Sequence, residues 1–298
     1  MRYYRVNEKF GERHLCVEAR DGVLTSLSSI NEMVREFRDL LDASYITGKS
    51  VDSIARRLLK QGRGRSFKMD QLIDWSISET GDARIIKPLE PDEMWAGGLG
   101  NMIMTPERLA EAPEGVRLAY NTPEITTNFY KGTNHRLVGP FDKVGIRADT
   151  ERTIAEGELV LVIYKGKLAG FSTGNEVAGG LGGQSANWLV PAKVFKGCAS
   201  LGPCIATPES IPDPMSLALE LVQYRGGKEI ARNEAPARLK RPPEEIVAST
   251  VAHDSPPDLV IQYTGGFTAV PDFPLQAGDV VRIAMEGVGF VQNAVEVV

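Results

Sequence analysis

Two glutamates separated by a single glycine open an aliphatic run in the middle of the sequence. Glu156 and Glu158 flank Gly157, and residues 159–163 are all Leu, Val or Ile. Because alternate residues of a strand point to the same face, the two carboxylates would project together where a strand enters the core. Neighbouring carboxylates repel each other unless a cation lies between them, and hard oxygen ligands favour Mg²⁺, Mn²⁺ or Ca²⁺. The same spacing also fits two surface acids at the solvated end of a strand.

A third acidic residue lies where the chain is expected to return. Glu176 follows a second β-like run, residues 168–171, and a turn at 165–167 joins this run to the first one. An antiparallel return would place Glu176 beside Glu156 and Glu158. Three carboxylates at one strand end favour a metal site, although a glutamate after Gly-Asn is also typical of a turn.

The elements that must position these residues fall into two groups. Short apolar runs in residues 1–27, with a turn signal at Asp21-Gly22, predict a β-hairpin. Apolar residues at helical spacing over 30–41 predict a helix capped by Ser29 or Asn31, and a second helix near 54–59 stops at Gly62. The prolines of residues 87–92 predict a linker, which gives domains 1–86 and 87–298.

The second group of elements is mostly β. From residue 118 onward, Gly and Pro separate short β-like runs, and residues 243–252 predict a helix. The predicted strands cover residues 144–147, 159–165, 168–171, 204–206, 217–224, 259–263, 279–285 and 290–298. A small mixed domain followed by a β-rich domain is an α+β fold.

The composition describes a globular, slightly acidic chain. Its 298 residues carry 34 Lys and Arg against 39 Asp and Glu, a net charge of −5, which argues against broad contacts with nucleic acid or anionic membranes. Three cysteines are too few for a disulfide framework, and no signal peptide or membrane-spanning apolar run is visible, so we expect a cytoplasmic protein. His14 and His253 are expected to be ordinary surface residues.

Several motifs occur in an order that resembles a known family. They are MWAGG (94–98), FYKGT (129–133), HRLVGP (135–140), EGE (156–158), KVFKGCASLGP (193–203), YTGG (263–266) and LQAGDVVRI (275–283). Residues 92–298 thereby resemble the fumarylacetoacetate hydrolase family, and within it the branch that acts on sugar acids. The resemblance implies a small N-terminal α+β domain and a C-terminal mixed β-roll that carries the site.

The resemblance also implies roles for individual residues. It implies a Mg²⁺ ion, with Mn²⁺ or Ca²⁺ as substitutes, that is chelated by the carboxylate and keto oxygens of a small-molecule 2-oxo acid. The implied metal ligands are Glu156, Glu158, Glu176 and Glu124; the implied catalytic residues are Lys193 and Lys131; the implied substrate contacts are Thr264, Gly265 and His135.

The sequence departs from the family pattern around the third ligand. Glu176 replaces an aspartate, which adds one methylene, and the Arg-Asp pair that the family carries after it is missing. Residues 178–183 are rich in glycine instead, which predicts a reshaped loop. A gapless match places Thr127 at the fourth ligand position, so Glu124 fits only if three residues are inserted.

The resemblance favours a Mg²⁺-dependent lyase that dehydrates a 2-keto-3-deoxy sugar acid through a metal-chelated enolate. One alternative is a C–C hydrolase of the acylpyruvate or fumarylacetoacetate type, or a 2-oxo acid decarboxylase. Another is a non-catalytic member that binds a metabolite. Family members commonly form homodimers or higher homo-oligomers, so we expect one here, with neither nucleic acid nor a membrane as a partner.

Overall fold

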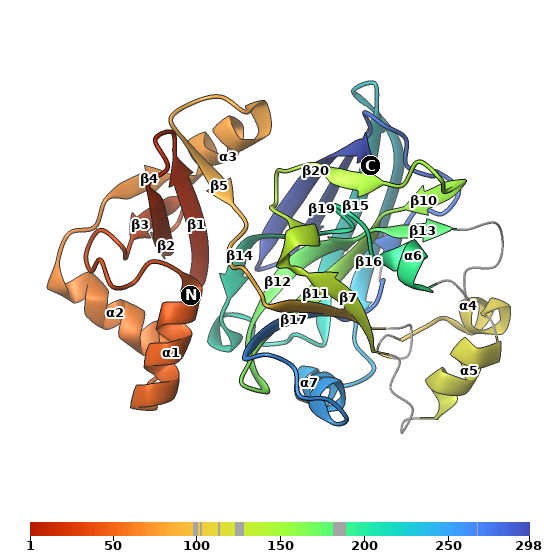
Figure 1. Ribbon diagram of the computed structural model, residues 1–298, viewed down its shortest axis with the longest axis horizontal. Helices are drawn as coiled ribbons and strands as arrows, with labels where there is room; N and C mark the ends of the chain where they lie inside the picture. The colour runs from red at the N-terminus through yellow and green to blue at the C-terminus, as the bar shows by residue number, and fades with distance from the viewer. Residues whose placement is uncertain (98–100, 102, 113, 123–127, 181–188, 267) are drawn as a thin grey trace.

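A computed structural model describes residues 1–97, 101, 103–112, 114–122, 128–180, 189–266 and 268–298. Figure 1 shows a smaller N-terminal part, in which helices lie beside a few strands, and a larger body made mostly of strands. This arrangement confirms the α+β fold class.

The N-terminal part is built on an antiparallel meander. Asp21-Gly22 forms the predicted turn between its second and third strands, where Gly22 has a φ of +69°. His14 is buried in the second strand, so the expectation of a surface residue is wrong for it, whereas His253 is exposed as expected. The elements are β1 (Arg2–Glu8), β2 (Arg13–Arg20), β3 (Val23–Ser26), β4 (Ser66–Lys68), β5 (Ala83–Ile86), α1 (Phe37–Thr47), α2 (Val51–Gln61) and α3 (Met69–Ser78).

The first helix begins later than the apolar spacing predicted. α1 starts at Phe37, after Glu36, and the side chain of Asp39 accepts the backbone N–H of Glu36 at 2.9 Å in a capping box. The prediction of a cap at Ser29 or Asn31 is therefore wrong. Residues 27–34 form turns instead, closed by backbone hydrogen bonds from Ile30 and Asn31 to Leu27 O and from Val34 to Asn31 O. The second helix, α2, ends at Gly62 as predicted.

One large sheet runs through the molecule. Within the described residues it has thirteen strands in the order β4-β3-β2-β1-β14-β12-β11-β17-β6-β7, with β18 beside β11, β5 beside β1 and β8 beside β14. The strands of its larger half are β6 (Glu93–Ala96), β7 (Phe129–Thr133), β8 (Leu137–Val138), β11 (Glu156–Tyr164), β12 (Lys167–Glu176), β14 (Ala199–Ala206), β17 (Leu259–Tyr263) and β18 (Thr268–Ala269).

A second sheet covers one face of β11 and β12. Its order among the described residues is β16-β15-β19-β20-β9, and a separate pair joins β10 to β13. The strand β16 escaped prediction because it is an edge strand with charged residues and Pro236. These strands are β9 (Val144–Ile146), β10 (Arg152–Ile154), β13 (Ala178–Gly180), β15 (Ser216–Arg225), β16 (Lys228–Arg238), β19 (Val280–Met285) and β20 (Gly289–Val297).

Short helices complete the body. α7 (Pro243–Val251) packs against β11 and β12, and it matches the predicted helix at 243–252. The others are α4 (Pro106–Glu111), α5 (Glu114–Asn121), α6 (Leu189–Lys193) and the 3-10 turns η2 (Asn134–Arg136) and η4 (Pro208–Ser210). Among the residues that the structure describes, no helix combines the length and the hydrophobicity that a membrane span requires.

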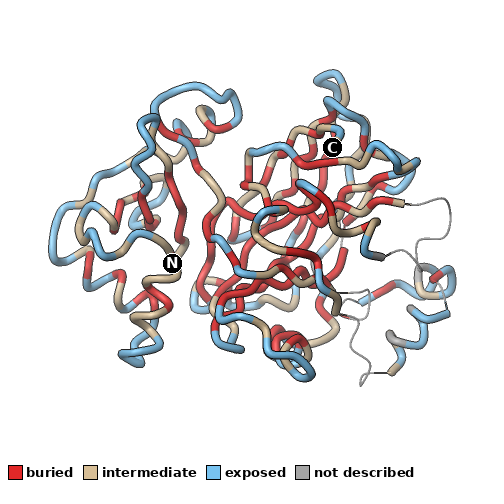
Figure 2. The backbone as a smooth tube through the Cα atoms, in the orientation of Figure 1, coloured by how far each residue is buried: buried red, intermediate tan, exposed pale blue. Residues whose placement is uncertain are grey.

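The core is centred on β11. Residues 159–163 are all at most 1% exposed, and Figure 2 shows buried backbone concentrated where the two sheets face each other. Each fully buried aliphatic side chain of this kind contributes about 1.5–3 kcal/mol of hydrophobic stabilisation. The strand that opens with Glu156 is therefore anchored by its own aliphatic half, which fixes the position of the acidic end.

The two parts of the chain share hydrogen bonds. β1 pairs antiparallel with β14, with Tyr3 opposite Ile205, so the large sheet continues from the N-terminal part into the body (Figure 1). Arg5 of β1 and Glu90 of the 87–92 segment add an ion pair at 2.8 Å. The division into domains at residues 86 and 87 stays a prediction.

Candidate functional site

The β11–β12 hairpin brings three glutamates together. Gly157 pairs with Asn175 and Glu158 pairs with Gly174, which places Glu176 at the same end as Glu156. One carboxylate oxygen from each of Glu156, Glu158 and Glu176 lies within 4.8 Å of the others. The antiparallel return that the sequence predicted is thus present, and it gathers the three predicted ligands.

Glu158 is the most deeply placed of the three. It is 1% exposed, and one of its oxygens accepts the backbone N–H of Gly265 at 2.8 Å. Burial, together with the negative charges of Glu176 and Glu156, raises the pKa of Glu158 well above its ordinary value. The site therefore resists a charge at Glu158 unless a cation is present.

Glu156 is more open than Glu158. Its side chain is 22% exposed, and Oε2 accepts a hydrogen bond from Lys193 Nζ at 3.2 Å. Burial raises the pKa of Glu156, the positive charge of Lys193 lowers it, and the negative charge of Glu176 raises it again. The resulting pKa is about 7. At neutral pH this carboxyl group is close to its own titration point.

Glu176 differs because two lysines contact it. Lys131 Nζ pairs with Oε1 and Lys193 Nζ pairs with Oε2. Burial alone would raise the pKa of Glu176, but these two ammonium groups outweigh it and lower the pKa to about 2. Glu176 is thus the fixed negative charge of the cluster.

The two lysines come from different elements. Lys131, on β7, is completely buried, donates to the backbone carbonyl of Val177 at 3.0 Å and lies over the Phe195 ring. Lys193, the last residue of α6, is 16% exposed and bridges Glu156 and Glu176. Burial would lower the pKa of Lys193, but the two glutamates raise it above its ordinary value. Lys193 is therefore an ammonium group at the open side of the cluster.

This donor set suits a divalent cation. The ligand atoms are all carboxylate oxygens, which Mg²⁺ prefers, and Mg–O bonds of about 2.1 Å place opposite ligand oxygens about 4.2 Å apart. The oxygens of Glu156, Glu158 and Glu176 lie within 4.8 Å, and two of these groups have raised pKa values that a cation would relieve. Such a cation would compete with Lys193 for the oxygens that its ammonium group now contacts.

The Thr-Gly-Gly segment closes one side of the cluster. Thr264 is buried, and its hydroxyl donates to Leu159 O at 2.9 Å. Gly265 has a φ of +120° and offers its N–H to Glu158. A Cβ on Gly266 would lie 3.3 Å from the Glu156 side chain, so this backbone runs directly against the cluster. In this arrangement Thr264 bonds to the backbone of β11, and Gly265 bonds to the side chain of Glu158. Contacts of these two residues with a substrate stay a prediction.

The remaining predicted residues are less tightly tied to the cluster. His135 is exposed on η2, and its role stays a prediction. Glu124 lies outside the described residues. Of the glycine-rich stretch 178–183, residues 178–180 form strand β13, paired with β10, so the loop prediction is wrong there; residues 181–183 lie outside the described part.

Sequence reasoning missed the partners that fix Lys131. The carbonyl of Val177 and the ring of Phe195 hold its buried ammonium group. Phe195 lies in the KVFKG motif, two residues after Lys193, so a signal was present in the sequence. What the motif did not indicate is that this aromatic ring faces the second lysine.

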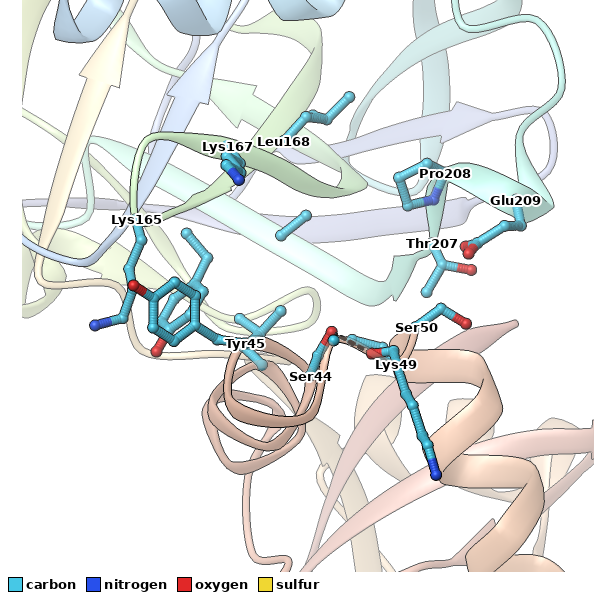
Figure 3. A pocket seen from close by; sticks show the side chains of 15 residues that line it. Ser44, Tyr45, Lys49, Ser50, Lys165, Lys167, Leu168, Thr207, Pro208 and Glu209 are labelled. Carbon is cyan, nitrogen blue, oxygen red and sulfur yellow. Dashed lines mark hydrogen bonds between the residues drawn. The ribbon is translucent and has the colours of Figure 1, made fainter.

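A separate cavity of about 480 Å³ lies between the N-terminal part and the body. Figure 3 shows Tyr45 and Lys165 at one end and Ser50 and Thr207 at the other, while the Lys49 side chain extends away from the hollow. Its lining includes none of the three clustered glutamates. The two places are distinct, and the carboxylate cluster is the candidate functional site.

Comparison with known proteins identifies the family. The family model described as fumarylacetoacetate (FAA) hydrolase C-terminal matches residues 104–296. The chain belongs to the fumarylacetoacetate hydrolase family. It is 32% identical over 297 residues to a probable 2-keto-3-deoxyxylonate dehydratase of Haloferax volcanii, covering 97% of each chain. It is 31% identical to a 2-dehydro-3-deoxy-D-arabinonate dehydratase of Saccharolobus solfataricus, covering 84% of this chain and 89% of the relative.

A solved structure shares the fold over the whole length. A 2-keto-3-deoxy-D-arabinonate dehydratase complexed with magnesium and 2,5-dioxopentanoate superposes with a TM-score of 0.81 at 22% identity, covering 100% of this chain and 99% of the other. The similarity therefore includes the N-terminal part as well as the β-rich body.

Proposed function

We propose that this chain is a Mg²⁺-dependent dehydratase that acts on a 2-keto-3-deoxy sugar acid. The observation that carries the proposal is the cluster of three glutamates held against two lysines. The family membership supports it, because a relative similar over 97% of this chain is a probable 2-keto-3-deoxyxylonate dehydratase. A neighbour of the same fold was solved with magnesium and 2,5-dioxopentanoate.

The glutamates would hold the metal. Glu156, Glu158 and Glu176 are the proposed ligands, and Glu124 is a further candidate. When bound, Mg²⁺ supplies positive charge that stabilises negative charge on the keto oxygen of a 2-oxo acid; Mn²⁺ or Ca²⁺ could replace it. Lys131 keeps Glu176 ionised and fixes its position through Oε1.

The dehydration itself needs proton movement at two carbons. A base accepts the proton from C3, and the C4 hydroxyl takes up a proton and leaves as water, so that one water molecule is lost overall. Lys193 is held as an ammonium group on the open side of the cluster, where it can donate a proton to the departing hydroxyl. Thr264, Gly265 and His135 are the proposed contacts for the substrate.

A product assay tests the proposal. Metal-stripped protein, with and without added Mg²⁺, is incubated with 2-keto-3-deoxyxylonate or 2-keto-3-deoxyarabinonate, and the products are followed by NMR. We expect 2,5-dioxopentanoate to form only with the metal present. Calorimetry with oxalate, which resembles an enolate of pyruvate, should show binding that also depends on Mg²⁺.

Other products would overturn the proposal in recognisable ways. Release of pyruvate from an acylpyruvate, where water can attack the distal carbonyl, would indicate a C–C hydrolase, and release of CO₂ from a 2-oxo acid would indicate a decarboxylase. Binding of the 2-oxo acid without any turnover would indicate a non-catalytic member of the family. Absence of Mg²⁺ binding at millimolar concentration would remove the metal from the mechanism.

We further propose that the protein works in the cytoplasm as a homodimer or higher homo-oligomer, on a small-molecule substrate. The cytoplasmic proposal is supported by Cys16, Cys198 and Cys204, which are buried and not joined in disulfides. The proposal of an oligomer is based on the homo-oligomers that members of the family commonly form. Light scattering coupled to gel filtration would test it, and a mass of 32.5 kDa in solution would contradict it.

A further inference from the structure

A second group of metal-binding side chains lies on the β1–β2 hairpin, in the N-terminal part. Val6 of β1 pairs with His14 of β2. Glu8 lies two residues after Val6, and Glu12 lies two residues before His14, so both glutamates point to the same face as His14. His14 Nε2 lies 2.8 Å from Glu8 Oε1 and 3.7 Å from Glu12 Oε1. One nitrogen and two carboxylate oxygens thereby converge on one point.

The imidazole of His14 is held rigidly. It is 2% exposed, packs against the Phe67 ring at 5.4 Å, and has Nδ1 3.0 Å from Ser26 Oγ. Ser26 Oγ also accepts the backbone N–H of Ser29. A hydrogen bond to the second ring nitrogen is what fixes the orientation of metal-binding histidines in proteins. Nε2 is thus aimed at the two carboxylates by groups outside the cluster.

The two glutamates carry a charge conflict that a cation would resolve. The backbone N–H of Glu8 donates to Glu12 O at 2.8 Å across the turn, so these like-charged residues face each other, which is destabilising. Arg65 compensates one oxygen of Glu8, Oε2, at 2.8 Å. Glu8 Oε1 and the carboxylate of Glu12, whose side chain is 65% exposed, are left facing His14 and the solvent.

We propose that Glu8, Glu12 and His14 form a second metal site, which takes a transition-metal dication of the Zn²⁺ type. One imidazole nitrogen with two carboxylates suits Zn²⁺ better than Mg²⁺, and three protein ligands leave a fourth position for water. The exposed Glu12 provides the route of entry. The bound ion would clamp the turn between β1 and β2 and act on the stability of the hairpin, apart from the chemistry at β11.

Histidine NMR separates this site from the carboxylate cluster. The chain has three histidines, and the three clustered glutamates have no histidine among them. The full chain, labelled with ¹⁵N-histidine and kept in excess Mg²⁺, is titrated with Zn²⁺. We expect the Nε2 signal of His14 to shift and saturate with one equivalent of bound Zn²⁺, while the signal of His253 stays unchanged.

Two variants make the test decisive. Glu12→Gln, which keeps the shape of a side chain that is 65% exposed, should weaken Zn²⁺ binding at His14 at least about tenfold. Glu32→Gln, beside the same surface hollow but outside the three ligands, is the matched control and should leave it unchanged. An unshifted His14 signal, or equal Zn²⁺ affinity in Glu12→Gln and wild type, would overturn the proposal and leave a hydrogen-bonded His–Glu pair.

Discussion

Two carboxylates in the strand-rich body are equally buried and yet lie in opposite surroundings. Glu158 and Asp279 are each 1% exposed. Asp279 accepts four hydrogen bonds, from the side chains of Gln223 and Arg225 and from the backbone N–H of Gln276. Burial opposes its ionisation, but these donors, Arg225 first, lower the pKa of Asp279 below its ordinary value.

Glu158 has far less support. Among the described residues it accepts one hydrogen bond, from Gly265 N–H, and its pKa is raised by burial and by the charges of Glu176 and Glu156. The comparison separates two uses of a buried acid. A fully hydrogen-bonded carboxylate stabilises the fold, whereas a poorly compensated group of carboxylates marks a place for a cation. Asp279, within the LQAGDVVRI motif, therefore has a structural role.

Removal of one clustered carboxylate should have the largest effect. Glu158→Ala and Glu156→Ala should each abolish Mg²⁺ binding and dehydratase activity, because carboxylates supply most of the affinity of such a site. Calorimetry and the product assay measure this, with circular dichroism to check folding. Glu209→Ala, an exposed glutamate on η4, is the control and should change neither. Full Mg²⁺ affinity in both variants would show that the ligands are assigned wrongly.

Removal of the Lys193 side chain should lower the rate of turnover without weakening the binding of Mg²⁺. Lys193→Ala should lower turnover at least about 100-fold, the usual contribution of a general acid. Its Mg²⁺ affinity should be no weaker than that of the wild type, because the ammonium group no longer competes for Glu156 and Glu176. Lys196→Ala, on a side chain that is 75% exposed, is the matched control. Unchanged turnover in Lys193→Ala would exclude Lys193 from the mechanism.

Substitution of Asp279, the fully hydrogen-bonded carboxylate, should lower the stability of the fold and leave Mg²⁺ binding unchanged. Asp279→Asn should lose about 2–3 kcal/mol of unfolding free energy at pH 7, since it removes charged hydrogen bonds in the interior, and should keep its Mg²⁺ affinity. Because the folded pKa of Asp279 is lowered, its stabilisation is complete above the unfolded value of about 3.9 and is lost as the pH falls through the folded pKa. Urea denaturation should therefore show the two proteins converging below about pH 4. A difference that stays unchanged as the pH falls through the folded pKa of Asp279 would contradict this account.

The smallest expected effect comes from the glycine between the two ligands. A Cβ on Gly157 would lie 2.5 Å from Thr268 Oγ1 and 3.0 Å from Leu219 Cδ2. Gly157→Ala should cost about 1–2 kcal/mol of stability through overpacking and should weaken Mg²⁺ binding by shifting the glutamates on either side. Thermal denaturation and calorimetry measure both. Gly115→Ala, in open space on α5, should be neutral or slightly stabilising.

Sequence patterns predicted that the three glutamates lie close together, but they did not predict which charged groups balance them. The spacing of Glu156 and Glu158 and the return to Glu176 follow from the period of a strand and a short turn, so they could be predicted. The pairing of Lys131 with Glu176 joins residues 45 positions apart, on strands β7 and β12, and no local pattern specifies it. The contrast between Glu158 and Asp279 depends in the same way on partners from other strands.

The errors in the fold have local causes. Residues 30–34 have helical spacing although they form turns: Ile30 and Val34 pack on the core, whereas Met33 is 76% exposed. The capping box at Glu36 decides where α1 begins. β16 was missed because an edge strand can carry charges where a central strand cannot. His14 was expected at the surface because a single polar residue in a strand gives no sign of the groups that bury it.

The pairing of β1 with β14 has a practical consequence for anyone who shortens this chain. All eight residues of β14 are buried, and β1 is hydrogen-bonded along the half that includes Cys204, Ile205 and Ala206. A fragment without the first 86 residues would present that half as a bare strand edge, which is a template for aggregation. The N-terminal meander therefore covers a strand edge that would otherwise promote aggregation. The region matched by the family model, from residue 104 onward, should precipitate when it is produced alone.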